Sequence, residues 1–202
     1  MTMACLLHRV VPLGLMLAVG GAVDAHAIEV KVSAQALERT LQTQLFNTPD
    51  GRYYMSGSAT TACYVYAEKP KVSFKDDRVV VHVHTRSKLG EGIHGACVGV
   101  SLTTDADVSF VPDAEGESVG FRDARVEKVS DSKELNFLLI PFLSHKLPSQ
   151  MKINAADLMR NLLSQSISST GYKFTLDSLK IHSMIVDHEA LVVDVDAGLG
   201  IE

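Results

Sequence analysis

Three histidines have the residue type and the spacing that a metal site would need. His82 and His84 stand two residues apart in RVVVHVH, where apolar and polar residues alternate as in a β-strand, so both imidazoles share one face. His94 follows in a glycine-rich turn. Three imidazoles can hold zinc in a tetrahedral site. A solvated strand face is the simpler interpretation and we adopt it, because no carboxylate or thiolate stands at a complementary short spacing.

Other catalytic arrangements are incomplete. Asp194 and Asp196 also stand two residues apart, but acids on an outward strand face usually serve solvation, and no supporting cleft for a glycosidase-type pair is evident. Ser58 follows Gly57 in a polar turn and lacks the G-x-S-x-G elbow of serine hydrolases. The glycine-rich segment 90–95 lies between two predicted strands, whereas a phosphate-binding loop leads into a helix. We therefore expect neither an enzyme nor a bound cofactor.

The cysteines point to an oxidising compartment. Cys5 belongs to the N-terminal segment described next, which leaves Cys63 and Cys97 in the mature chain. Two thiols in an exported protein most often form one disulfide, so we predict that these two are joined. A redox-active pair is the alternative, and the chain lacks the C-x-x-C spacing that lowers a thiol pKa.

The N-terminus has the order of a secretory signal peptide. Arg9 gives a short basic region, residues 10–23 are apolar, and Ala25-His26-Ala27 supplies a cleavage signature. The apolar run is shorter than the roughly 20 residues that a membrane-spanning helix needs. We predict a signal peptide at 1–27 and one periplasmic domain at 28–202, without a transmembrane anchor after cleavage.

Composition excludes several partners. The formal net charge is −5 and no basic cluster is present, which argues against nucleic acid and against an anionic membrane surface. Tryptophan is absent and aromatic residues make up 6%, so platforms for base stacking are not expected.

Hydrophobic periodicity predicts an α+β domain in which helices and short antiparallel strands follow one another. We expect helices at 34–46 after a Ser33 cap, at 135–147 with a bend at Pro141, and at 155–170 after an Asn154 cap. Strands are predicted at 28–32, 53–55, 60–66, 71–74, 78–89, 97–111, 119–129, 172–186 and 190–201. Turns are predicted at 75–77, 90–92, 112–117 and 187–189.

The segment 137–143 is apolar on every side. A helix of that composition needs cover all round, and one sheet covers only one side. We expect the remaining side to be covered by another helix, a protein partner or an apolar ligand.

The order of these elements resembles the small bacterial TULIP-like proteins, one-domain relatives of the BPI and SMP lipid-binding modules. The resemblance covers nearly all of 28–202 and is carried by the leading helix SAQALERTLQTQLF, the antiparallel meander, the bent apolar helix and the closing hairpin LKIHSMIVDHEALVVDVDAGLGI. It implies a curved antiparallel sheet wrapped around one long and one short amphipathic helix. It also implies an apolar groove lined by Leu41, Leu45, Phe142, Leu158 and Leu162. The lipidation cysteine of several relatives is missing, which indicates a free periplasmic protein.

Two functions remain open at this point. The first is a periplasmic, cell-envelope module that binds a lipid or another apolar small molecule in a groove between helices and sheet. The alternative is an envelope protein–protein adaptor or inhibitor with an exposed apolar patch.

Overall fold

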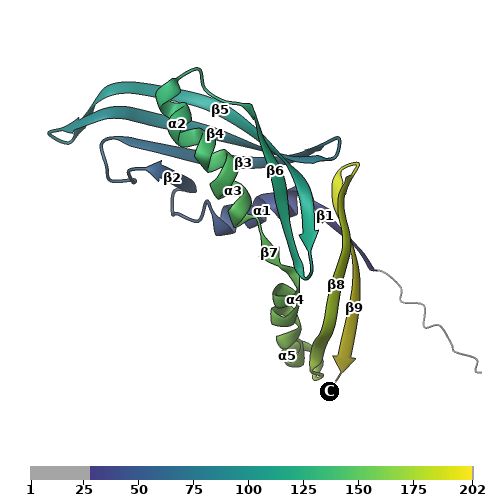
Figure 1. Ribbon diagram of the computed structural model, residues 1–202. Coiled ribbons are helices and arrows are strands. Elements are labelled where there is room, and N and C mark those ends of the chain that lie inside the picture. Colours follow the sequence, from purple (N-terminus) through teal and green to yellow (C-terminus); the bar gives the residue numbers. More distant parts are fainter. Residues whose placement is uncertain (1–27, 202) are drawn as a thin grey trace, which may run out of the picture.

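The chain folds into two antiparallel sheets that are joined and partly covered by helices (Figure 1). The computed structural model describes residues 28–201, so the predicted signal peptide at 1–27 lies outside the described residues. The larger sheet has the strand order β2-β3-β4-β5-β6-β7, and the smaller has the order β1-β9-β8. The predicted mixture of helices and antiparallel strands is confirmed.

The larger sheet curls strongly, in the manner of a half-barrel (Figure 1). Its strands are β2 (Arg52–Ser56), β3 (Tyr64–Lys75), β4 (Arg78–Ile93), β5 (Ala96–Glu115), β6 (Ser118–Lys128) and β7 (Ile153–Asn154). Register shifts interrupt the β2–β3, β3–β4 and β5–β6 pairs. Such bulges bend a strand and increase its twist, which suits a sheet that curls this far.

The turn predicted at 90–92 is wrong. The β4–β5 ladder continues through Gly90, and the chain turns at His94 and Gly95, whose φ angles of 47° and 82° suit a two-residue hairpin turn. Gly90 and Gly99 lie opposite each other in this ladder. A Cβ at Gly99 would come within 2.0 Å of the Leu89 carbonyl oxygen, so these glycines permit a close approach of two strands.

The smaller sheet consists of β1 (Ile28–Ser33), β9 (Ala190–Ile201) and β8 (Phe174–Asp187). Apolar residues alternate along β9, and Leu191, Val193 and Val195 face inward and are buried. The strand β1 pairs only with residues 190–195 of β9, so the second half of β9 extends past it.

Three helical segments complete the described chain, where the resemblance implies one long and one short helix. The elements are α1 (Ala34–Gln44), the contiguous α2 (Lys133–Pro141), η1 (Phe142–Lys146) and α3 (Leu147–Gln150), and the pair α4 (Ala155–Ser164) and α5 (Ser166–Thr170). The predicted caps are confirmed, because Ser33 Oγ accepts a hydrogen bond from the Ala36 amide and Asn154 Oδ1 accepts one from the Asp157 amide.

The predicted break at Pro141 takes the form of a change in helix type. Proline has no N–H to donate, and α2 ends at this residue. The chain then makes one wider π-helical turn, η1, in which the Leu147 amide bonds to the Phe142 carbonyl. The helical path therefore continues across one face of the larger sheet (Figure 1).

Candidate functional site

An apolar groove lies between α4 and the inner face of the smaller sheet. It encloses a hollow of about 210 Å³. Its lining consists of aliphatic side chains and methionine: Val30, Val32, Val119, Ala155, Leu158, Met159, Leu162, Leu179, Val193 and Val195. We call this hollow the α4 groove. A wholly apolar lining of this kind offers a ligand no hydrogen bond and selects for hydrocarbon.

The helix α4 forms one wall of the groove. Ala156 is fully buried, so it fixes the face by which α4 packs onto the protein. Leu158 and Leu162 are one turn apart, and their side chains are 51% and 63% exposed. An apolar pair left this open on the wall of a hollow costs solvation free energy until something covers it.

The smaller sheet forms the floor. The antiparallel register sets Val30 opposite Val193 and Ile28 opposite Val195, so side chains from β1 and β9 share the inner face. The same face continues past the hollow to Leu199 and further along β9. The groove therefore opens onto a longer apolar surface.

The five residues that the resemblance implied are not brought together in one hollow. Leu158 and Leu162 line the α4 groove. Leu41, Leu45 and Phe142 are buried members of the main hydrophobic core, and the Phe142 ring stacks on a tyrosine of β2. The sequence did not single out the valines of β1 and β9 as lining residues, although their alternation already placed them on one strand face.

The apolar run of α2 divides between core and surface. Leu135 and Leu139 are fully buried, as is Leu143 in η1. The opposite side of α2 is open, because Phe137 is 80% exposed and Ile140 is also exposed. The side that was predicted to need a cover is therefore uncovered within the described chain.

The histidines of β4 contact carboxylates of β5 that the spacing in the sequence did not predict. His82 Nδ1 lies 2.6 Å from Asp107 Oδ1, and His84 Nδ1 lies 2.7 Å from Asp105 Oδ1 on the neighbouring strand. The hydrogen bond with His84 is the largest cause that holds the pKa of Asp105 below its ordinary value. His94 stands at the end of the hairpin, far along β4 from this pair.

A metal site does not follow from this arrangement. Among residues 28–201, no group of three or more His, Cys, Asp and Glu side chains could hold a metal ion. The cross-strand pairs instead link β4 to β5 on the outer face of the sheet. The signal for them was the His94-Gly95 turn, which fixes the register that sets Asp107 opposite His82.

The two aspartates of β9 have separate surroundings. Asp196 Oδ2 lies 2.6 Å from His182 Nε2 on β8. In the strand register, Asp194 stands opposite Glu29 of β1 and Ser183 of β8. Both are partly exposed and lie on the outer face, as expected for solvated acids.

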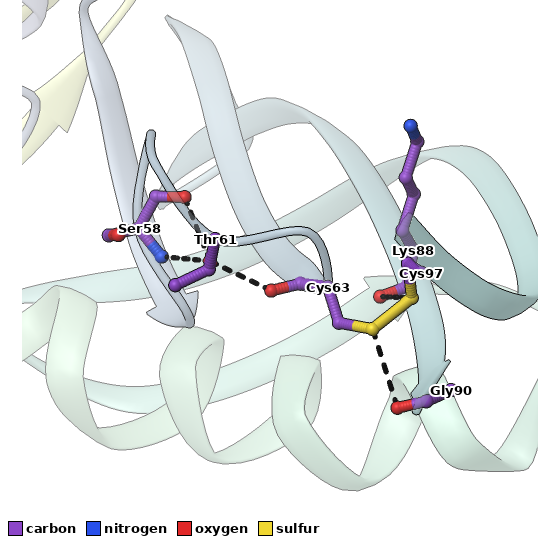
Figure 2. The surroundings of a disulfide bond; sticks show 6 residues. All are labelled: Ser58, Thr61, Cys63, Lys88, Gly90 and Cys97. Carbon is purple, nitrogen blue, oxygen red and sulfur yellow. Dashed lines mark hydrogen bonds between the residues drawn. A yellow bond between two sulfur atoms is a disulfide. The ribbon is translucent and has the colours of Figure 1, made fainter. Parts of the chain in front are cut away.

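The predicted disulfide is confirmed. Cys63 and Cys97 are bonded, with 5.0 Å between their Cα atoms, and they tie the loop before β3 to the start of β5 (Figure 2). The loop on the Cys63 side is braced by Thr61, whose Oγ1 accepts a hydrogen bond from the Ser58 amide and lies 3.0 Å and 2.9 Å from the carbonyl oxygens of Ser58 and Cys63. The bond therefore fastens the far end of the β4–β5 hairpin to β3.

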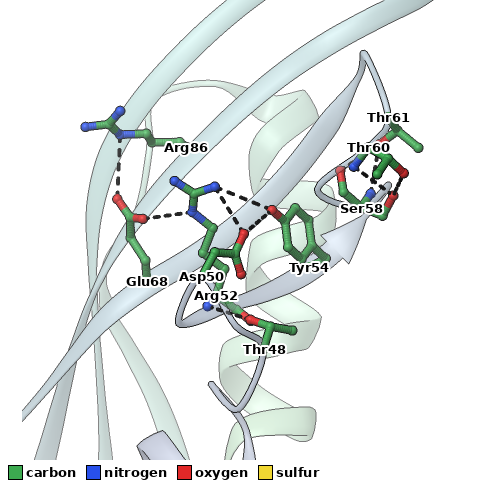
Figure 3. Close-up of polar contacts among 9 residues, drawn as sticks. All are labelled: Thr48, Asp50, Arg52, Tyr54, Ser58, Thr60, Thr61, Glu68 and Arg86. Atoms are coloured by element: carbon green, nitrogen blue, oxygen red, sulfur yellow. Dashed lines mark hydrogen bonds and ion pairs between the residues drawn. The ribbon is translucent and has the colours of Figure 1, made fainter.

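A second polar cluster stands on the outer face of β2 and β3 (Figure 3). Glu68 is buried, and Arg52 Nε donates to it at 3.1 Å while Arg86 Nε lies 3.7 Å away. The Tyr54 hydroxyl donates to Asp50 at 2.7 Å, and this hydrogen bond is the largest cause that lowers the Asp50 pKa. The carboxylates and guanidinium groups here pair with one another, so the cluster has the properties of a structural network.

None of the helices within residues 28–201 is long and apolar enough to cross a membrane. Comparison of the chain with protein-family models, with curated proteins and with solved structures finds no match.

Proposed function

We propose that the protein is a periplasmic binding module that holds a lipid or another apolar small molecule in the α4 groove. The observation that carries the proposal is the groove itself, an open hollow with an entirely aliphatic and methionine lining. It is not an enzyme in this proposal, because the groove presents no polar group to a reacting bond.

The size of the hollow sets the affinity that it can provide. At roughly 30 Å³ for a unit the size of a water or a methylene, a hollow of about 210 Å³ takes about seven methylenes. Each buried methylene contributes about 0.8 kcal/mol, which gives a total of about 5 to 6 kcal/mol. Association costs about 4 to 15 kcal/mol, so the hollow alone supports weak binding at most. A longer chain that continues over the open inner face of β9 would bind more tightly.

The resemblance to TULIP-like proteins supports this proposal at the level of architecture. A curled antiparallel sheet beside amphipathic helices agrees with the fold that those lipid-binding modules share. In this proposal Leu41, Leu45 and Phe142 support the fold from the core, and Leu158 and Leu162 contact the ligand. The disulfide agrees with an oxidising compartment, and we place the mature chain in the periplasm after cleavage at Ala27.

A chain-length series tests the proposal. The protein is stripped of bound lipid, and the dissociation constants of saturated fatty acids of increasing length are measured by calorimetry. Each added methylene should lower the constant about fourfold until the groove is filled, after which the gain should fall. Affinities that do not change with chain length, or no binding by any fatty acid or phospholipid, would contradict the proposal.

Paired variants locate the site. Leu158→Glu puts a charge on the groove wall at an exposed position, so the fold should persist while binding weakens at least tenfold. Ile185→Glu is the matched control, because Ile185 is 55% exposed and lies on the outer face of β8. Equal weakening by both variants, with both still folded, would show that the ligand does not occupy the groove.

The alternative function, an envelope adaptor or inhibitor, is favoured by a different surface. Phe137 is exposed on α2, and Ile93, Val98 and Val100 are exposed at the end of the β4–β5 hairpin, which extends past α2 (Figure 1). Exposed aromatic and aliphatic side chains of this kind are typical of protein-binding patches. For an adaptor, Phe137→Ser should abolish a complex isolated from the native envelope, and Leu158→Glu should leave that complex intact.

A further inference from the structure

A second hollow lies where the β4–β5 hairpin extends past the first turn of α2 (Figure 1). Its volume is about 550 Å³, which is larger than that of the α4 groove. We call it the hairpin hollow, and its lining consists of Leu89, Gly90, Val100, Leu102, Ser132 and Glu134. None of these residues lines the α4 groove, so the two hollows are separate sites.

The floor of the hairpin hollow is apolar strand surface. Leu89 stands opposite Val100, and Leu102 lies two residues further along β5, so the three side chains share one face of the ladder. Val83, on the same face of β4, is fully buried, whereas Val100 is 60% exposed. The described chain therefore covers this face in the middle of the sheet and leaves it open at the hollow.

The disulfide holds the floor in shape from the other side of the sheet. Cys97 precedes Val98 in β5, so its side chain points to the opposite face from the floor. Cys63 Sγ lies 3.4 Å from the Gly90 carbonyl oxygen, and Cys97 Sγ lies 3.6 Å from the Lys88 carbonyl oxygen (Figure 2). A floor that is fixed before binding loses less conformational entropy when a ligand arrives.

The wall of the hollow supplies one charge, the Glu134 carboxylate in the first turn of α2. Ser132 Oγ accepts a hydrogen bond from the Leu135 amide and donates one to Glu134 Oε2 at 2.8 Å. The backbone amide of Glu134 and the Ser132 hydroxyl hold the pKa of Glu134 below its ordinary value, and no cation is among the causes. The carboxylate is therefore ionised at neutral pH, and no side chain within residues 28–201 neutralises it.

We propose that the hairpin hollow binds a single-chain alkylammonium, with its hydrocarbon on the aliphatic floor and its ammonium group at Glu134. The floor selects hydrocarbon, and the carboxylate selects a cationic head group over a neutral or an anionic one. The formal net charge of −5 acts in the same direction. A phospholipid fits less well, because its phosphate would lie beside the carboxylate.

This site goes beyond the ligand proposed for the α4 groove. The α4 groove presents no polar side chain, so it cannot distinguish one head group from another. The hairpin hollow should prefer an amine to a fatty acid of equal length, since a second carboxylate would be repelled. At roughly 30 Å³ for each methylene, a hollow of about 550 Å³ has room for an eight-carbon chain.

Methyl NMR of residues 28–202 tests the site residue by residue. Leucine and valine methyl groups are labelled, and octylammonium chloride or its neutral counterpart, octanol, is titrated below any micelle concentration. The methyls of Leu89, Val100 and Leu102 should shift with one dissociation constant. That constant should be about three- to fivefold lower for octylammonium than for octanol, as expected of an exposed ion pair. The methyls of Leu158 report on the α4 groove separately.

Paired variants separate the charge from the floor. Glu134→Gln removes the charge at nearly constant size, so it should weaken octylammonium binding about three- to fivefold and leave octanol binding unchanged. Glu91→Gln is the matched control, because Glu91 stands opposite Val98 in the same hairpin and does not line the hollow. It should leave both constants unchanged. Val100→Ser removes aliphatic surface and should weaken both ligands.

Four results would overturn the proposal. The first is a titration with octylammonium in which the floor methyls do not shift. The second is a Glu134→Gln variant that weakens octylammonium and octanol equally, and the third is a Glu91→Gln variant that weakens octylammonium as much as Glu134→Gln does. The fourth is a lysophosphatidylethanolamine with an eight-carbon chain that binds at these methyls as tightly as octylammonium, which would assign the hollow to a phospholipid.

Discussion

Removal of the Cys63–Cys97 bond should destabilise the protein by an amount that its position in the chain determines. The two cysteines are 34 residues apart. In the chain-entropy model, a bond that closes a loop of that length raises the free energy of unfolding by about 3.8 kcal/mol, because it restricts the unfolded chain. A Cys63→Ser/Cys97→Ser double variant should therefore lose about 3 to 4 kcal/mol of the free energy of unfolding.

The structure also predicts which part of the chain should open first when the bond is removed. The bond joins the loop before β3 to the free end of the β4–β5 hairpin, where Ile93, Val98 and Val100 are exposed. That end gains little from burial, whereas Val81 and Val108, in the middle of the same ladder, are fully buried. Without the bond the hairpin end should open locally while the middle of the ladder stays closed.

Two measurements follow from this reasoning. Urea unfolding, followed by circular dichroism, compares the wild type, the wild type with a phosphine reductant and the double variant. Hydrogen exchange with peptide-level mass spectrometry should show faster exchange at 88–100 and unchanged exchange at 79–83. A decrease in the free energy of unfolding below about 1 kcal/mol, or an equal increase in exchange in both segments, would refute the conclusion that this bond holds the hairpin end in place.

Three further perturbations have outcomes that the structure fixes. Leu139→Ala empties a fully buried site and should lower the free energy of unfolding by about 2 to 5 kcal/mol. Phe137→Ala, at an 80% exposed position, should change the free energy of unfolding by about 0.5 kcal/mol or less. Equal urea midpoints for the two variants would contradict this difference. Gly99→Ala places a Cβ 2.0 Å from a backbone oxygen of the neighbouring strand and should lower the melting temperature, whereas Gly92→Ala, with no atom within 4 Å, should be tolerated. The pKa of Asp105 lies below its ordinary value of 3.8, chiefly through a histidine hydrogen bond, so its contribution to stability is present above pH 3.8 and is lost as the pH falls through the lowered pKa. The stability difference between the wild type and Asp105→Asn should then shrink in acid urea titrations, and a difference that is constant down to about pH 2 would exclude this linkage.

Local signals in the sequence predicted two helix caps and the break at Pro141, and the count of cysteines in the mature chain predicted the disulfide. Ser33 and Asn154 are the side chains that cap α1 and α4, and Pro141 marks the change of helix type. Each of these depends on residues a few positions apart, which a sequence displays directly.

The errors arise where a residue has two physical uses. Gly90 suggested a turn, but it allows two strands to approach closely, and the turn uses His94 and Gly95. The contact between His82 and Asp107 depends on the register of the β4–β5 ladder. Because the turn was predicted at the wrong residues, this carboxylate neighbour was not predicted either.

The groove depends on tertiary packing that periodicity does not reveal. Its walls come from β1, α4 and β9, which lie far apart along the chain. Alternation predicted which face of each strand is apolar, but the angle at which α4 crosses the sheet decides whether Leu158 is covered. No local pattern encodes that angle.

The order in which these elements close follows from the length of chain between them. The β4–β5 ladder runs without a register shift from its His94–Gly95 turn, so it can zip from neighbours in sequence on a microsecond timescale. β1 pairs with β9 across almost the whole described chain, and contacts of such long separation form slowly. The hydrocarbon-lined hollow should thus be the last part of the protein to be completed during folding, and pulse-labelled amides of Val30 and Val193 should gain protection after those of Val81 and Val108.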